Sequence, residues 1–173
     1  MPPTILIAGR RIDVIREGPH GSAWFAHRDG AGILTGIEMR GPAWRSFSAG
    51  GEKTLFRLPG SNGRLHRVTV CEAAIDALSL AAIELKRDDT LYTSTAGGIG
   101  PATVAALRQL VHDLSADPAG VLIAATDANL AGRRYAVRLE EMAAAAGARF
   151  DRILPPGGLN DWNDALRAMT LVP

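Results

Sequence analysis

The second part of the chain alternates between short apolar runs and longer segments with helical periodicity. The apolar runs predict buried strands at residues 68–72, 91–95, 121–126 and 149–154. The segments that follow them predict helices at residues 74–86, 101–115, 130–146 and 161–169. Strand–helix units with short connections favour an α/β fold, with a mostly parallel sheet, right-handed crossovers and helices on both faces.

The first 65 residues have a different pattern. Short alternating or apolar segments are separated by glycines and Gly-Pro pairs, and no helix of convincing length fits among them. This pattern predicts a small antiparallel sheet or a set of hairpins. The polar, turn-forming segment 61–67 marks the expected boundary, so we predict a small β-rich region at residues 1–65 and an α/β domain at residues 66–173.

Basic and aromatic side chains are interleaved towards the end of the β-rich region: Arg40, Trp44, Arg45, Phe47, Lys53, Phe56 and Arg57. Such interleaving can hold a nucleic-acid single strand, because the cations contact phosphates and the aromatic rings stack on bases. The alternative is a half-buried sheet in which the aromatic residues belong to the core and the basic residues face solvent.

Composition and charge narrow the classes of protein. The chain has 173 residues and a formal net charge of +1, whereas a dedicated nonspecific nucleic-acid binder would usually be more basic. Its single cysteine, Cys71, cannot form an intramolecular disulfide, which fits a reducing compartment. No apolar run approaches the length of a membrane span, and the first residues lack the architecture of a signal peptide. We therefore expect a cytoplasmic protein.

Acidic side chains follow several of the predicted strands. Glu72 ends the first strand of the α/β domain, Asp127 follows the third, and Asp161 follows the last. The carboxyl ends of parallel strands lie at one edge of a sheet, where open α/β sheets hold their ligands, so these residues should share a crevice. Asn129 adds an amide oxygen close to Asp127. Oxygen ligands suit Mg²⁺, which keeps several waters and is commonly completed by substrate phosphates.

Some of these residues have a structural alternative. Asp76 lies four residues after Glu72, about one turn inside the next helix, and can therefore face the same crevice. Asp127 or Asn129 could instead cap the helix that follows them, and Asp161 could cap the last helix.

A glycine-rich loop, STAGGIGPAT at residues 94–103, precedes the second helix of the α/β domain. The backbone N–H groups around Gly97 and Gly98 could cradle a phosphate at the helix N-terminus, although glycines also serve plain tight turns. The loop matches neither a P-loop nor the dinucleotide fingerprint. Arg133, in the first turn of helix 130–146, could contact phosphates or be a solvated helix residue.

Taken together, these motifs resemble the Toprim domain, which bacterial-type primases, type IA and type II topoisomerases and some nucleases share. VCEAAIDALSL at residues 70–80 is similar to the first Toprim motif of primase-like proteins, and ATDANLAGRR at residues 125–134 is similar to the second. LPPGGLNDWNDAL at residues 154–166 resembles the acidic tail of Toprim proteins carried by plasmids, phages and conjugation modules. Residues 32–58 resemble the small β region that precedes the domain in those proteins. The resemblance implies a Rossmann-like Toprim fold.

The resemblance also implies roles for individual residues. It implies Glu72 as the general acid/base and as part of the metal site, Asp127 and residue 129 as Mg²⁺ ligands, and Asp161 as a further acidic contributor. Asn129 departs from the family pattern, because it replaces an aspartate and so removes one negative charge. The sequence contains no cysteine-rich zinc module and no helicase motif, so we do not expect a complete replicative primase.

Three functions follow as expectations. The leading one is a Toprim enzyme, dependent on Mg²⁺ or Mn²⁺, that acts on phosphodiester bonds, either by primase-like nucleotidyl transfer, which we favour, or as a Toprim nuclease. Its expected partners are single-stranded DNA, nucleotides and a helicase or relaxase. The second is a non-catalytic nucleic-acid-binding module of a replication or mobilisation complex. The third, motivated by the glycine-rich loop, is a mononucleotide-binding α/β domain. Topoisomerase chemistry is disfavoured, because the only tyrosines, Tyr92 and Tyr135, lie inside predicted elements.

Overall fold

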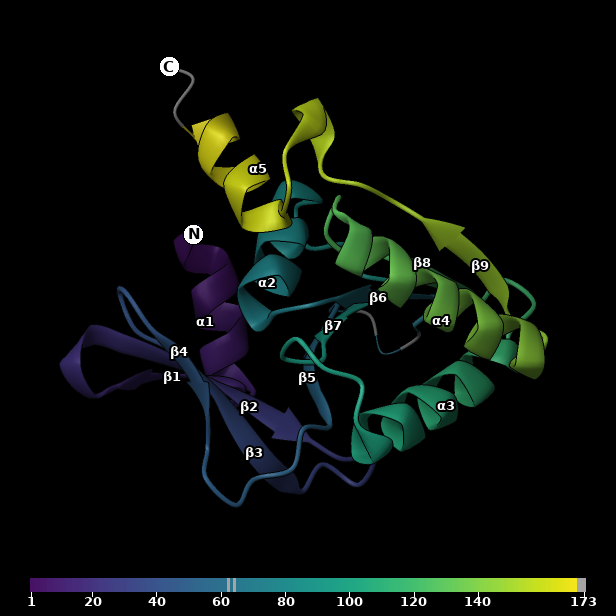
Figure 1. Cartoon of the computed structure of the whole chain (residues 1–173), viewed down its shortest axis with the longest axis horizontal. Helices are drawn as coiled ribbons and strands as arrows, with labels where there is room; N and C mark the ends of the chain where they lie inside the picture. Colours follow the sequence, from purple (N-terminus) through teal and green to yellow (C-terminus); the bar gives the residue numbers. More distant parts are fainter. Residues whose placement is uncertain (62, 64, 171–173) are drawn as a thin grey trace.

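A computed structural model describes residues 1–61, 63 and 65–170 of the chain, and its strands form one mixed sheet (Figure 1). The parallel half has the order β7-β6-β8-β9. Its strands are β6 (Arg67–Cys71), β7 (Thr90–Ser94), β8 (Val121–Ala124) and β9 (Arg149–Arg152). The mostly parallel sheet expected for residues 66–173 is confirmed. Because β6 lies between β7 and β8, the carboxyl ends of these strands are neighbours.

Helices cover both faces of the parallel half (Figure 1). They are α2 (Ala74–Ile83), α3 (Pro101–Ser115), α4 (Leu130–Ala146) and α5 (Trp162–Thr170). The helices α2 and α5 pack together over one core that includes Leu78 and Trp162, while α3 and α4 pack over a second core that includes Leu107 and Leu139. Within the described residues, none of the helices combines the length and apolarity needed to cross a bilayer.

The observed helices and strands of this half lie within a few residues of those predicted. The largest difference is the end of α2, which stops at Ile83 and not at residue 86. Leu85 and Lys86 adopt positive φ values of 55° and 50°, so the backbone leaves the helical conformation there. Lys86 nevertheless donates its backbone N–H to the carbonyl of Ala81 at 2.6 Å, which closes the end of the helix.

The N-terminal region continues the same sheet with antiparallel strands. They are β1 (Ile15–Gly18), β2 (Ser22–Arg28), β3 (Leu34–Arg40), β4 (Arg45–Phe47) and β5 (Leu55–Pro59). The strand β5 pairs antiparallel with β7, which places the N-terminal strands directly beside the parallel half. The division at residue 65 remains a prediction, and Asn62 and Arg64, in the expected boundary segment, lie outside the described residues.

The N-terminal region also contains a helix, α1 (Pro3–Arg11), so the expectation that no helix fits in the first 65 residues was wrong. Proline at the start of α1 suits the first turn, where its missing N–H is not needed. Gly9 serves close packing, because a Cβ there would lie 2.2 Å from Cδ1 of Ile15. The exposed face carries Leu6 and Ile7, so the polar and apolar positions of this short helix are poorly separated in the sequence.

Candidate functional site

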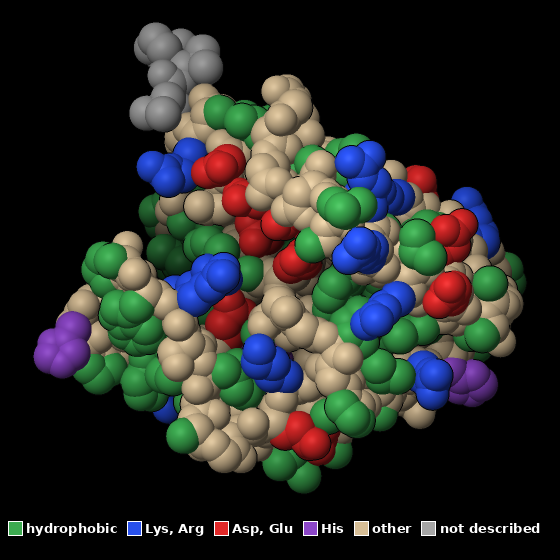
Figure 2. Space-filling model, in the orientation of Figure 1, with side chains coloured by type: hydrophobic (Ala, Val, Ile, Leu, Met, Phe, Trp, Pro, Cys, Tyr) green, Lys and Arg blue, Asp and Glu red, His purple; other side chains and the backbone are tan. Residues whose placement is uncertain are grey.

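A cavity of about 540 Å³ opens at the carboxyl ends of β6 and β8, between the parallel half and the N-terminal strands. Its acidic wall, defined by Glu72, Asp76, Asp127 and Asp161, comes from the parallel half. Its basic wall, defined by Arg40, Arg45 and Lys53, comes from the N-terminal region. Figure 2 shows carboxylates gathered at the centre of one face of the molecule, with basic side chains close to them. The cavity therefore offers cation ligands on one side and anion ligands on the other.

Glu72 and Asp127 come together because β6 and β8 are adjacent parallel strands. The backbone N–H of Asp127 donates to Oε1 of Glu72 at 3.3 Å, so the two residues are in direct contact. Burial and the Asp127 carboxylate raise the pKa of Glu72 above its usual range. Burial and Asp161 raise the pKa of Asp127, against the lowering effect of the Asn129 amide. The acidic wall thus carries mutually repelling negative charge, which a bound cation would relieve.

Asp76, in the first turn of α2, lines the same cavity as Glu72, as the four-residue spacing predicted, and it is largely buried. Its Oδ1 accepts the backbone N–H of Asn163 at 3.1 Å, which ties the start of α5 to α2. Burial and the nearby Asp161 raise the pKa of Asp76 to about 7. At neutral pH this carboxyl is therefore close to half-protonated and adds a variable charge beneath the cavity.

Asn129 and Asp161 act as helix caps. Oδ1 of Asn129 accepts the N–H of Gly132 at 2.9 Å, and its amide nitrogen donates to Oδ2 of Asp127 at 3.3 Å. Oδ1 of Asp161 accepts the N–H of Asp164 at 2.8 Å at the start of α5. The capping alternative thus describes both side chains, and their roles as metal ligands stay predictions. Gly132 is required at this turn, since a Cβ there would lie 2.1 Å from the carbonyl oxygen of Asp127.

The glycine-rich loop is anchored to the acidic wall. The N–H of Gly97 donates to the carbonyl of Glu72 at 2.7 Å, and the carbonyl of Gly98 accepts the hydroxyl of Tyr135 at 3.1 Å. Gly97 lines the cavity, but among the described residues Gly98 and Arg133 are not part of its lining. The loop therefore positions Glu72, while phosphate binding by Gly97, Gly98 and Arg133 stays a prediction.

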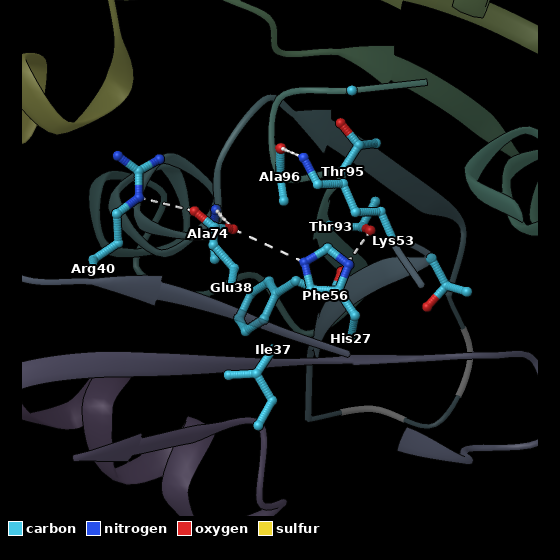
Figure 3. Close-up of polar contacts among 12 residues, drawn as sticks. His27, Ile37, Glu38, Arg40, Lys53, Phe56, Ala74, Thr93, Thr95 and Ala96 are labelled. Carbon is cyan, nitrogen blue, oxygen red and sulfur yellow. Dashed lines mark hydrogen bonds and ion pairs between the residues drawn. The ribbon is translucent and has the colours of Figure 1, made fainter. Parts of the chain in front are cut away.

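Sequence reasoning missed Glu38, a buried carboxylate that joins the two walls (Figure 3). Its Oε2 accepts the backbone N–H of Ala74 at 3.1 Å, at the start of α2, and its Oε1 accepts Nε of Arg40 at 2.9 Å. Its Oε2 also lies 3.9 Å from Nε2 of the buried His27, too far for a hydrogen bond. Burial alone would raise the pKa of Glu38, but His27, Arg40 and the Ala74 N–H together lower it.

The available signal for Glu38 was its position on the buried face of β3, where a glutamate is unusual. The other end of the basic wall is fixed in a comparable way. Nζ of Lys53 donates to the carbonyl of Ala96 at 3.0 Å, within the glycine-rich loop (Figure 3). Backbone groups of the parallel half therefore hold Lys53 directly and hold Arg40 through Glu38.

The carboxylates of the acidic wall fit a divalent cation that takes its remaining ligands from water and phosphate. Within the described residues, no group of three or more His, Cys, Asp and Glu side chains is arranged to hold a metal ion together. Mg²⁺, however, is often bound through one or two carboxylates, several waters and substrate phosphates. Glu72 and Asp127 provide such a pair, and burial together with neighbouring carboxylates raises the pKa of each.

The structure is thus an α/β domain with acidic residues at the carboxyl ends of its parallel strands, and comparisons with known proteins agree with this class of fold. The sequence profile of the Toprim-like family matches residues 69–166, more than half of the chain, and the chain belongs to this family. Residues 1–63 match a family described as a protein of unknown function (DUF3991). No protein of curated function matches the sequence.

Two solved structures share the fold. The first is the primase fragment of the bacteriophage T7 primase-helicase protein, with 16% identity and a TM-score of 0.54 over 95% of this chain and 68% of that one. The second shows bacteriophage T7 lagging-strand DNA polymerase interacting with primase domains bound to an RNA/DNA hybrid and dTTP. Its matching chain has 17% identity and a TM-score of 0.55, over 95% of this chain and 81% of that one. At these identities the likeness to the two structures establishes the fold alone.

Proposed function

We propose that this chain is the catalytic core of a primase-like enzyme, which joins nucleotides on a single-stranded nucleic-acid template with Mg²⁺ or Mn²⁺. The observation that carries the proposal is that Glu72, Asp127 and Asp161 line one cavity opposite a basic wall. Membership in the Toprim-like family supports it. The T7 primase domains bound to an RNA/DNA hybrid and dTTP support the choice of a polynucleotide and a nucleotide as ligands. A helicase or relaxase partner belongs to the same proposal.

Glu72 and Asp127 are the residues that would hold the cation, and Asp161 would add negative charge beside them. A cation bound there would neutralise phosphate charge and act as a Lewis acid on a phosphoryl oxygen. Asn129 would contribute mainly by steadying Asp127 through its amide N–H.

Glu72 also suits the role of proton acceptor. Its raised pKa brings the carboxylate closer to the working pH, where general bases are most effective, and the Asp127 N–H fixes its position. In the proposed reaction a nucleotide hydroxyl gives its proton to Glu72 as its oxygen bonds to the α-phosphorus of a nucleoside triphosphate, and pyrophosphate leaves. Arg45 and Lys53, across the cavity, would bind phosphate oxygens.

The test is calorimetric titration of Mg²⁺ and Mn²⁺ in the presence of single-stranded DNA. Asp127→Asn removes one charge at constant volume, so we expect metal affinity to fall at least about tenfold, since second-shell changes alone reach this size. Asp113→Asn, an exposed α3 residue outside the cavity, is the matched control and should bind metal normally. Equal affinity in all three proteins would overturn the assignment of the site.

A second candidate is a non-catalytic nucleic-acid-binding module. The use of Asn129 and Asp161 as caps favours it, because fewer side chains are then free for a metal. This candidate predicts strand binding without metal that survives Glu72→Gln, and no incorporation of labelled nucleotides on any template. The catalytic proposal predicts metal-dependent incorporation that Glu72→Gln abolishes.

A further inference from the structure

The turn between β3 and β4 exposes an indole ring beside two arginines. Trp44, at the end of this turn, is 46% exposed, and Arg45 next to it is also exposed. The backbone N–H of Gly41 donates to the carbonyl of Trp44 at 2.9 Å and closes the turn. Trp44 is thus an exposed aromatic ring next to a cationic side chain.

The indole is held in place by the backbone of the turn. A Cβ at Gly41 would lie 2.1 Å from Nε1 of Trp44 and 2.3 Å from its Cε2, so the ring rests against Gly41. The ring is thus supported on one side while nearly half of the residue stays open to solvent. A ring fixed in this way loses little conformational freedom when it stacks on a ligand.

Arg40 and Arg45 are direct cross-strand partners in the β3–β4 pair. Like charges in directly opposite positions destabilise a hairpin. Glu38 holds Arg40, but Arg45 has no ion-pair partner within the described residues. Both arginines line the acidic cavity and also a shallow hollow over the turn itself. A phosphate chain that crosses the hairpin would offset this repulsion.

The other aromatic residues of the interleaved sequence do not offer such a surface. Phe56 is fully buried and packs edge-on against Phe25, and Phe47 packs edge-on against the buried His27. For Phe56 the core alternative is the better description, whereas Phe47 is partly buried and lines the cavity, with Nζ of Lys53 5.5 Å from its ring centroid. Trp44 is the exposed ring of the set, and it lies beside the arginine pair.

We propose that the β3–β4 hairpin binds a single-stranded nucleic acid, with Trp44 stacking on a base and Arg40 and Arg45 contacting the adjacent phosphates. The strand then enters the cavity along its basic wall. That this strand is a template rests on the proposed function, whereas the binding itself does not. An exposed ring flanked by cations is the combination that recognises single strands of any sequence.

Tryptophan fluorescence gives a direct test, because the chain has only Trp24, Trp44 and Trp162. Trp162 is buried, with its Nε1 bonded to the carbonyl of Ala125 at 2.8 Å, and Trp24 is partly buried. Titration with oligo(dT) or oligo(U), without metal, should quench the emission of the wild type and of Trp24→Phe. Trp44→Phe should lose the quenching.

Anisotropy of labelled oligo(dT) gives the affinities. We expect Trp44→Ala to bind about tenfold more weakly, as expected for the loss of one stacked base. Arg45→Gln should reduce the salt dependence of binding by about 0.7 in log–log slope, the value for one phosphate contact on a single strand. Arg149→Gln, which removes an exposed arginine on the edge strand β9, is the control and should leave the affinity unchanged.

The same titrations in Asp127→Asn separate this proposal from the catalytic one. Strand binding and quenching should persist there even if nucleotide transfer is lost or never occurs. Unchanged affinity and quenching in both Trp44→Ala and Arg45→Gln would overturn the hairpin assignment. So would a poly-glutamate peptide that quenches Trp44 as strongly as oligo(dT), because the hairpin would then be a site for acidic proteins.

Discussion

The two walls of the cavity are built in different ways. The acidic wall follows from strand order, because Glu72 and Asp127 sit at the ends of the adjacent parallel strands β6 and β8. The basic wall follows from packing: Arg40 and Lys53 reach the cavity from antiparallel strands and loops, and contacts to the parallel half hold them there. The first arrangement is local to each strand end, whereas the second depends on residues far apart in the sequence.

Because of this difference, substitutions in the two walls should have different effects. A change in the acidic wall alters charge and ligands but leaves the sheet intact. A change at Glu38 removes the residue that bonds both to Arg40 and to the start of α2. The basic wall is therefore coupled to the stability of the fold, and the acidic wall is coupled mainly to pH and ligands.

The largest effect is expected for Glu38→Ala. The substitution leaves the N–H of Ala74 and the buried part of Arg40 without their acceptor. Leaving a buried donor without its acceptor typically costs about 1–3 kcal/mol in the free energy of unfolding, and more where the donor is charged. Urea unfolding, followed by circular dichroism, measures this loss.

Two variants accompany that measurement. Glu38→Gln keeps an acceptor for Ala74 and should lose less stability. Glu52→Ala, which truncates an exposed glutamate of the same region, should change stability by less than about 0.5 kcal/mol. If Glu38→Ala were as stable as Glu52→Ala, the hydrogen bonds from Glu38 to Arg40 and Ala74 would contribute nothing to the free energy of unfolding.

An intermediate effect is expected for Asp76→Asn, and it depends on pH. The carboxyl of Asp76 has a pKa of about 7 in the folded protein and an ordinary value near 3.8 when unfolded. Between these values the folded state keeps a proton that the unfolded state releases, so wild-type stability falls as the pH rises from about 4 to 7. Asparagine avoids this loss and can still accept the N–H of Asn163. We expect the variant to be more stable by on the order of 2 kcal/mol at pH 8, and similar at pH 4.

Urea unfolding at pH 4, 6 and 8, with EDTA to exclude metals, measures that difference. Glu72 and Asp127 are present in both proteins, so the difference between the two reports on residue 76. If the difference in unfolding free energy between the variant and the wild type were the same at every pH, Asp76 would not titrate in this range.

The acidic wall could be predicted from the sequence because it depends on a rule of topology. A strand pattern followed by an acid, repeated in an alternating α/β order, places the acids at one sheet edge wherever the crossovers are right-handed. The sequence could not decide how Asn129 and Asp161 use their oxygens, since a capping residue and a ligand have the same composition and nearly the same position.

The basic wall and α1 could be predicted only in part. The interleaved basic and aromatic residues were visible, but Phe56 is buried because its strand pairs on both sides, whereas Trp44 is exposed in the turn before β4. Glu38 obtains its role from Ala74, 36 residues further along the chain, and no local pattern reports such a contact. In α1, the close packing at Gly9 depends on Ile15, which lies outside the helix.

The smallest effect is expected at Asn129. Its substitutions distinguish a role as a helix cap from a role as a metal ligand. As the N-cap of α4, Asn129→Ala should lose about 1 kcal/mol of unfolding free energy, whereas Asn129→Asp keeps the acceptor for Gly132 and should lose less. Asn129→Asp also replaces the amide donor to Asp127 with a second carboxylate, so without metal it adds repulsion and with Mg²⁺ it adds a ligand. Thermal unfolding with EDTA and then with saturating Mg²⁺ therefore gives a clear distinction. A metal-induced rise in Tm that is larger in Asn129→Asp than in the wild type places residue 129 at the metal. Equal rises would leave Asn129 as a cap alone, with Glu72 and Asp127 carrying the cation.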